Sequence, residues 1–195
     1  MRVRESLPLR YLVRLASDSF RSREGFLRGV RSLSTSVGGN VRNPKWTSYG
    51  ALEIDVFVNS RPDFDLLQAA LEPVSKIEFV HDLNEAPPHK SKEEIISEAR
   101  SYFNSERFWE AHETLEALWR VSSGDEKLLL QGLILVCAAF VHHQKGEEET
   151  GQSVLRRANR QLNWPQSMYE EMDLERLRRR VQKILATKGF QVFRI

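Results

Sequence analysis

The hydrophobic pattern of this chain changes period at two adjacent prolines, Pro87 and Pro88. Before them, patterns typical of strands dominate, whereas after them apolar residues recur every three or four positions, as in helices. Adjacent prolines remove backbone donors and disfavour a helix in front of them. We therefore predict an α+β chain with a domain over residues 1–84, a linker over 85–90 and a helical bundle over 91–195.

The first part is predicted to contain six elements in the order β-α-β-β-α-β. Its clearest strand spans residues 52–58, where apolar residues alternate strictly, and Ser60 can cap the helix that follows. The second strand contains Pro44 and must therefore be an edge strand or irregular. This order predicts a ferredoxin-like domain, whose sheet offers a way to pair two copies as a homodimer.

The second part is predicted to contain about five helices and no strands. Ser91 and Glu94 form a capping box at the first helix. The longest uncharged stretch, Leu128–Gln144, has 17 residues, which is the lower edge of membrane-spanning length, and it carries polar side chains. We interpret it as the buried central helix of the bundle, not as a membrane span. The apolar tail Phe190–Ile195 is expected to pack back on the body.

The overall charge is +2, which argues against a polyelectrolyte binder by default. The charge is nevertheless segmented, with +7 over residues 1–50, −6 over 91–149 and +6 over 150–195. One cysteine, Cys137, excludes a disulfide framework and a Cys-based zinc site, and its apolar surroundings suggest an inert thiol. The start of the chain has too short an apolar run for a signal peptide, so we expect a cytoplasmic protein.

The helix expected over about residues 106–121 carries the candidate site. Phe108, His112, Leu115 and Trp119 fall within about 60° on a helical wheel, which predicts that His112 lies in the buried stripe. Glu116 follows one turn after His112, at the edge of that stripe.

Two other carboxylates of this helix and two polar residues of the next helix complete the candidate set. Glu113 is expected beside Glu116, and Glu110 is expected to point outward. On the next helix Gln131 and His142 share one face about 16 Å apart, so one site can hold only one of them together with His112.

Three readings of this arrangement remain open. A buried His–Glu hydrogen bond would make it structural, and we give this reading the greatest weight. The residues can also form a binding pocket without a metal. Finally, His112, Glu116 and His142 are candidate ligands for a divalent metal such as zinc, iron or manganese, although their order matches neither a zinc-protease nor a di-iron motif.

The same residues resemble a known family. Residues 108–119 read FWEAHETLEALW, residues 130–134 read LQGLI and residues 138–142 read AAFVH. This series is similar to the helical domain-of-unknown-function family numbered 309, over about residues 95–162. The resemblance implies a small helical bundle with no established activity. It marks as family positions Glu110, His112, Glu113, Glu116, Trp119, Gln131 and His142. Where the family tends to have Gly-Asn and Gly-Ala, this chain has Gly146-Glu147 and Gly151-Gln152.

These observations leave three classes of function. The first is an uncharacterised binding or scaffold protein with a His/Glu pocket for an unknown small molecule or protein. The second is nucleic-acid binding through basic N- and C-terminal surfaces, which would use Arg176, Arg178, Arg179, Arg180 and Lys183. Glu53 and Asp55, expected on the outer sheet face, argue against base stacking there. The third is a metal-dependent hydrolase or oxidase.

Overall fold

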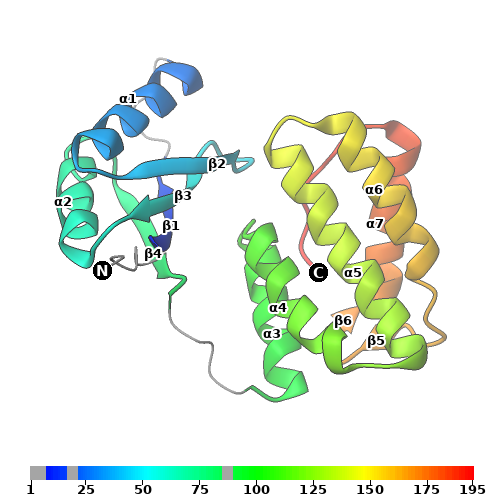
Figure 1. Cartoon of the computed structure of the whole chain (residues 1–195). Coiled ribbons are helices and arrows are strands. Elements are labelled where there is room, and N and C mark those ends of the chain that lie inside the picture. The colour runs from blue at the N-terminus through cyan, green and yellow to red at the C-terminus, as the bar shows by residue number, and fades with distance from the viewer. Residues whose placement is uncertain (1–7, 17–21, 85–89) are drawn as a thin grey trace, which may run out of the picture. The chain divides into compact units, whose positions relative to one another are not determined.

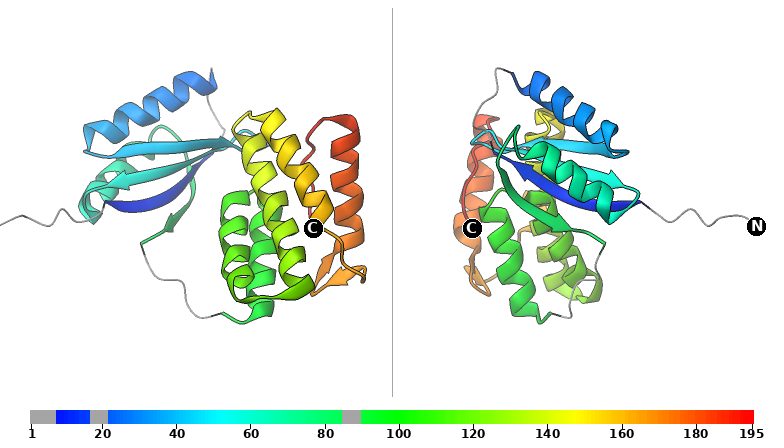
Figure 2. Two further views of the ribbon diagram at one scale, coloured as in Figure 1. Left: turned by 45° about the vertical axis from the view of Figure 1, so that its right-hand side comes forward. Right: turned by 90° about the vertical axis from the view of Figure 1, so that its left-hand side faces the viewer.

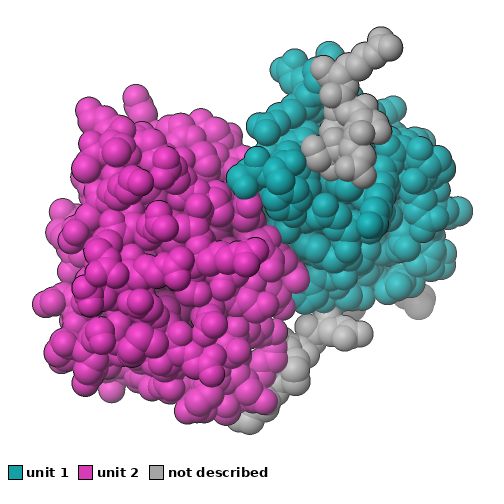
Figure 3. Space-filling model, turned by 180° about the vertical axis from the view of Figure 1, so that it is seen from behind, with its two compact units in different colours: residues 1–88 teal, residues 89–195 magenta. Residues whose placement is uncertain are grey.

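A computed structural model describes residues 8–16, 22–84 and 90–195. The chain divides into two compact units, Met1–Pro88 and His89–Ile195, which Figure 3 distinguishes by colour. The linker expected over 85–90 lies almost wholly outside the described residues.

The N-terminal unit is an antiparallel sheet of four strands with two helices (Figure 1). Its elements are β1 (Leu9–Leu15), α1 (Arg23–Ser36), β2 (Asn40–Trp46), β3 (Leu52–Val58), α2 (Arg61–Leu71) and β4 (Ile77–Asp82). The order of strands across the sheet is β2-β3-β1-β4. Both helices pack on the same face of the sheet, so the apolar side chains of alternate strand residues meet them in one core (Figure 2).

Local sequence signals explain several boundaries of this unit. The Ser60 side chain accepts a hydrogen bond from the Asp63 backbone at the start of α2, as predicted. Strand β2 is an edge strand, and its pairing with β3 shifts register between Arg42 and Lys45, around Pro44. Pro44 lacks a backbone N–H, which is why this strand tolerates it only at the edge.

The sheet face opposite the helices carries ion pairs. Glu53 binds Arg14 Nη2 at 2.7 Å and Lys45 Nζ at 2.5 Å, while Asp55 binds Arg10 Nη2 at 2.7 Å. Both carboxylates predicted on this face are thus neutralised by cations of neighbouring strands.

The C-terminal unit is mostly helical. It comprises α3 (Lys92–Asn104), α4 (Phe108–Val121), α5 (Gly124–Gln144), α6 (Glu148–Gln161), β5 (Met168–Tyr169), β6 (Met172–Asp173) and α7 (Leu174–Thr187). Helix α5 lies between α4 and α6 and supplies the largest share of the core, because it is apolar on most of its circumference. The capping box of Ser91 and Glu94 is present at the start of α3, as predicted. The short β5–β6 hairpin was not expected from the sequence.

The long apolar helix and the C-terminal segment of this unit agree with the sequence predictions. Among the described helices, none is long and apolar enough to cross a membrane, and Leu128–Gln144 lies within α5. The tail after α7 packs back on the bundle, with Phe193 only 7% exposed.

Candidate functional site

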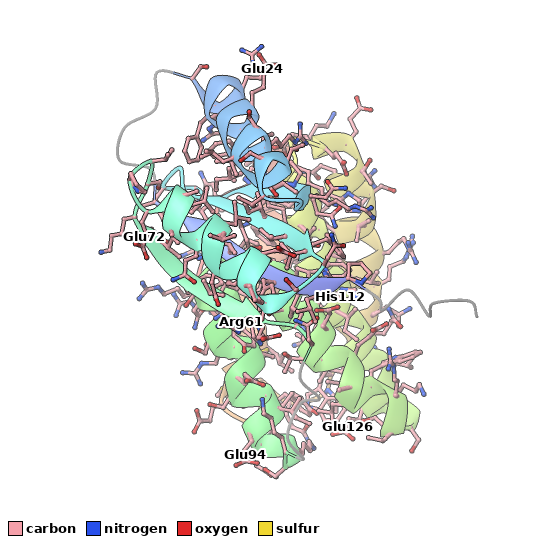
Figure 4. All side chains as sticks on the ribbon, turned by 60° about the vertical axis from the view of Figure 1, so that its left-hand side comes forward. Glu24, Arg61, Glu72, Glu94, His112 and Glu126 are labelled. Carbon is pink, nitrogen blue, oxygen red and sulfur yellow. The ribbon has the colours of Figure 1, made fainter. Side chains whose placement is uncertain are left out.

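The buried stripe of α4 differs by part of a turn from the predicted one. Its buried apolar residues are Phe108, Ala111, Leu115 and Leu118. His112, which is labelled in Figure 4, follows Ala111 on the helix and is half-buried. The stripe is shifted because α4 packs against α3 as well as α5, which draws the Ala111 side of the helix into the core.

His112 lies flat against the ring of Trp109. The two ring centroids are 5.2 Å apart and the planes differ by 6°. Burial lowers the pKa of His112 below its ordinary value of 6.5, while the Glu116 carboxylate and the Ile134 backbone partly oppose this shift. Burial therefore favours the neutral form of the imidazole. Its Nδ1 atom is buried and has no hydrogen-bond partner among the described residues.

The carboxylate one turn away does not bond to this imidazole. Glu116 Oε2 instead accepts a hydrogen bond from Arg120 Nη2 at 3.1 Å. Glu113, further round the helix, is exposed. The buried His–Glu hydrogen bond expected from the spacing is thus not formed by His112 and Glu116 in the described structure.

The expectation that Glu110 points outward is wrong. Its side chain is 3% exposed and pairs with Arg107 Nε at 2.6 Å. A helical wheel of α4 alone does not reveal this, because the neighbours of Glu110 include Tyr102 of α3 and Arg107 in the turn before α4.

The polar residues of α5 lie at different heights along the bundle. Gln131 is half-buried and lies one turn before Ile134, the residue whose backbone forms a hydrogen bond with His112. His142 lies near the end of α5, where its Nδ1 is 2.5 Å from Glu147 Oε2 at the start of α6. His142 therefore belongs to the α5–α6 turn, whereas Gln131 lies on the same part of the hairpin as His112.

The described residues do not form a metal centre. No group of three or more His, Cys, Asp or Glu side chains within residues 8–16, 22–84 and 90–195 is placed to hold a metal ion. His142 is engaged by Glu147 and Glu116 by Arg120, so the three candidate ligands do not converge. We derive no metal chemistry from them.

Two cavities of the C-terminal unit lie elsewhere. One is an apolar void of about 10 Å³ in the core. The other is a groove of about 340 Å³ between α3 and the β5–β6 hairpin, lined by Glu93, Glu94, Ile96, Ser97, Arg100, Glu170 and Glu171. Neither cavity is lined by His112 or Glu116. In the core, burial raises the pKa of Cys137 to about 12, in keeping with the inert thiol expected from the sequence.

The five candidate basic residues of α7 differ in their contacts within the fold. Arg178 donates hydrogen bonds to the carbonyl oxygens of Leu162 and Trp164, at 2.7 and 2.5 Å, just after α6 ends. Arg179 pairs with Glu175 at 2.7 Å. The other three candidates, Arg176, Arg180 and Lys183, lie at intervals of four and three residues along α7.

The two positions where this chain departs from the family pattern have structural partners. Glu147 binds His142, as described above, and Gln152 Nε2 donates to the Ile184 carbonyl oxygen at 3.4 Å. The first of these contacts links α5 to α6 and the second links α6 to α7. The pattern of residues indicates that both positions differ, but only the fold shows which side chains they meet.

The site and fold together define a helical domain with the EAHExLExxW signature, which follows an antiparallel sheet in the same chain. Residues 96–154 match the family model of DUF309, a domain of unknown function. The match covers less than half of the chain, so the similarity to this family is that of a segment of the C-terminal unit, and the recognition from the sequence is confirmed there. The match does not extend to the N-terminal unit.

Two relatives share similarity with the chain. An uncharacterized protein from Aquifex aeolicus (strain VF5) is 25% identical over 169 residues, which are 86% of this chain and 43% of that protein. The chain therefore spans less than half the length of this curated relative. A crystal structure of a conserved hypothetical protein from Thermus thermophilus is 30% identical and covers 46% of this chain and 94% of its own, with a TM-score of 0.41.

Proposed function

We propose that this protein is a binding or scaffold protein whose DUF309 domain recognises its ligand through one face of the α4–α5 hairpin. We call this surface the α4–α5 face. It consists of Trp109, His112, Glu116 and Trp119 on α4 together with Gln131 and Leu135 on α5, all of them half-buried. Three of these residues, Trp109, Trp119 and Leu135, pack against the edge of the core with part of their surface left uncovered.

The observation that carries the proposal is the state of His112. A hydrogen bond with the Ile134 backbone holds the imidazole against α5. A purely structural histidine is nevertheless expected to have both ring nitrogens satisfied, because an unsatisfied buried polar atom costs about 1–3 kcal/mol. Here Nδ1 has no partner among the described residues, and the neighbouring carboxylate binds Arg120. Tryptophan is enriched among the residues that dominate binding energy at interfaces, so Trp109 and Trp119 beside a ring nitrogen without a partner suit a surface that gains contacts on binding.

The nearest alternatives have less support. A metal site lacks converging ligands among the described residues. Nucleic-acid binding through α7 loses two of its five candidate side chains to contacts within the fold, since Arg178 and Arg179 are engaged by Leu162, Trp164 and Glu175.

For the N-terminal unit we propose the ferredoxin-like fold. The element order β-α-β-β-α-β, the strand order β2-β3-β1-β4 and the placement of both helices on one face support it. In this proposal the unit serves as a pairing or regulatory module beside the DUF309 domain.

A comparison of unfolding free energies tests the role of His112. If the imidazole serves binding, His112→Ala should cost about 1 kcal/mol or less, as for a residue outside the core. The core control Leu115→Ala, one turn away and 2% exposed, should cost about 2–5 kcal/mol. Urea unfolding followed by circular dichroism measures both. An equal loss in the two variants would assign His112 to the structure instead.

A further inference from the structure

The segment after α7 runs back along the helices of the C-terminal unit (Figure 1). Two aromatic side chains of this segment, Phe190 and Phe193, pack against Phe140 of α5. We call residues 190–195 the tail and define the tail groove by Phe103 and Asn104 of α3, Phe140 and His143 of α5, and Gly151 of α6. The tail groove is separate from the α4–α5 face, because the two share no residue.

The first anchor of the tail is Phe190. Its ring stacks on His143, with centroids 4.8 Å apart and planes within 9°, and meets Phe140 edge-on at 5.3 Å. A Cβ atom on Gly151 would come within 3.0 Å of this ring, so the glycine leaves room for it.

The second anchor is Phe193, three residues further on. Its ring is buried between Phe103 and Phe140, at centroid distances of 5.5 and 5.6 Å. Ile195 follows Phe193 by two residues, and the Asn104 side chain binds both the N–H and the carbonyl group of its backbone. Asn104 Oδ1 accepts from the Ile195 N–H at 2.8 Å and Asn104 Nδ2 donates to the Ile195 carbonyl at 3.1 Å. The residues of the groove therefore contact the two rings of a Phe-x-x-Phe pattern and the backbone of residue 195.

The tail is held by these anchors without a main-chain ladder. In residues 90–195 the backbone hydrogen bonds of turns and loops include none from the tail to another backbone group. The segment that joins it to α7 contains Lys188, whose φ of 56° is left-handed, and Gly189. A docked segment that is anchored by side chains and joined through a short hinge is the arrangement in which copies of a chain exchange an identical element.

We propose that the tail groove accepts the tail of a second copy of this chain, so that two copies can exchange tails and associate. The groove offers a trans tail the same aromatic contacts and the same Asn104 amide that it offers the tail of its own chain. In a single chain the covalently attached tail competes at a high effective concentration, which keeps exchange rare at low protein concentration.

The first arm of the test measures binding in trans. A fluorescent synthetic peptide with the sequence of residues 189–195, GFQVFRI, is titrated onto the intact chain and onto the full chain carrying Phe190→Ala and Phe193→Ala. We expect saturable binding that is at least about tenfold tighter to the double variant, because its own tail no longer competes. A peptide with alanine in place of Phe193 should lose this binding, whereas one with alanine in place of the exposed Arg194 should keep it. Equal binding to both chains, or none to a folded double variant, would overturn the proposal.

The second arm measures association of the full chains. After refolding at high protein concentration, sedimentation should show an association step for the intact chain and for the matched control Arg194→Ala that is absent from the double variant, beyond any pairing through the N-terminal unit, which all three chains share. The same association in the double variant as in the intact chain, or an intact chain that stays monomeric at every concentration, would contradict tail exchange. Should circular dichroism show that the double variant is unfolded, Phe190→Ala alone replaces it in both arms, since that ring is only half-buried.

Discussion

His112 combines partial burial with an ionisable ring, and this gives the C-terminal unit a defined sensitivity to acid. Its pKa in the folded state lies below the ordinary value of 6.5, chiefly because burial disfavours the imidazolium. Between these two pKa values the unfolded chain binds more protons than the folded chain. The free energy of unfolding is therefore expected to fall as pH drops below about 6.5 and to level off below the folded pKa.

The substitution His112→Gln should remove this contribution. We expect the difference in unfolding free energy between the wild type and the variant to shrink from about pH 7.5 to about pH 5, with the wild type losing more. Urea unfolding at several pH values measures the difference, and an NMR titration of the imidazole gives the folded pKa directly. A difference that stays constant over this range would contradict the assigned cause.

Residue positions were predictable from the sequence where they depend on one helix alone. The placement of Glu116 one turn after His112 follows from helical geometry. A helical wheel of α4 places both His112 and Arg120 one turn from Glu116, but it does not show which of them Glu116 binds. It also does not show that Glu110 is buried. These contacts are decided by packing and by competing partners, so the sequence left the structural and binding readings of His112 open.

At the scale of elements, Arg178 illustrates a side chain whose role is set by the end of another helix. The carbonyl groups in the last turn of a helix lack partners within that helix. Arg178 donates to the Leu162 carbonyl at the end of α6 and to the Trp164 carbonyl beyond it. The sequence does not predict this contact, because Leu162 and Arg178 are separated by the segment that contains the β5–β6 hairpin.

We expect Arg178→Ala to cost about 1–3 kcal/mol of stability, since it leaves partly buried carbonyl groups without their donor. The adjacent Arg179 is the matched control. It is 65% exposed and pairs within its own helix, so Arg179→Ala should cost no more than about 0.5 kcal/mol. Thermal and urea unfolding of both variants check the contrast. Similar small losses would show that the bonds of Arg178 to α6 contribute little.

Elements with strong local signals were predictable, and those without them were not. The Ser91 capping box, the Ser60 cap and the edge position of β2 around Pro44 follow from local chemistry. The β5–β6 hairpin has only two residues in each strand, too few to show an alternating pattern. The hairpin is instead anchored by long-range contacts, such as that of Tyr169 Oη with Glu126 at 2.9 Å.

At the scale of the whole molecule, the two units have separate apolar cores. Among the residues that the structure describes, the core of the helical unit is made of residues between 95 and 195, and the core of the sheet unit of residues between 9 and 77. A unit with its own core and its own capped first helix can fold without the rest of the chain.

We therefore predict that residues 91–195 alone form a folded domain. Far-ultraviolet circular dichroism of this fragment should show a helical spectrum, and heating should give one cooperative transition. A disordered spectrum, or a broad transition without cooperativity, would mean that the helical unit depends on residues 1–90.

The proposed binding role of the α4–α5 face can be tested by site-specific photo-crosslinking in cells that naturally contain the protein. A benzophenone side chain placed at Glu113, which is exposed beside Trp109 and Glu116, should give a discrete adduct. The matched position Arg157, exposed on α6, should give none, and Trp119→Ala should weaken the adduct at 113 without unfolding the domain. The absence of an adduct at 113, or the same adduct at 113 and 157, would contradict a binding surface on this face.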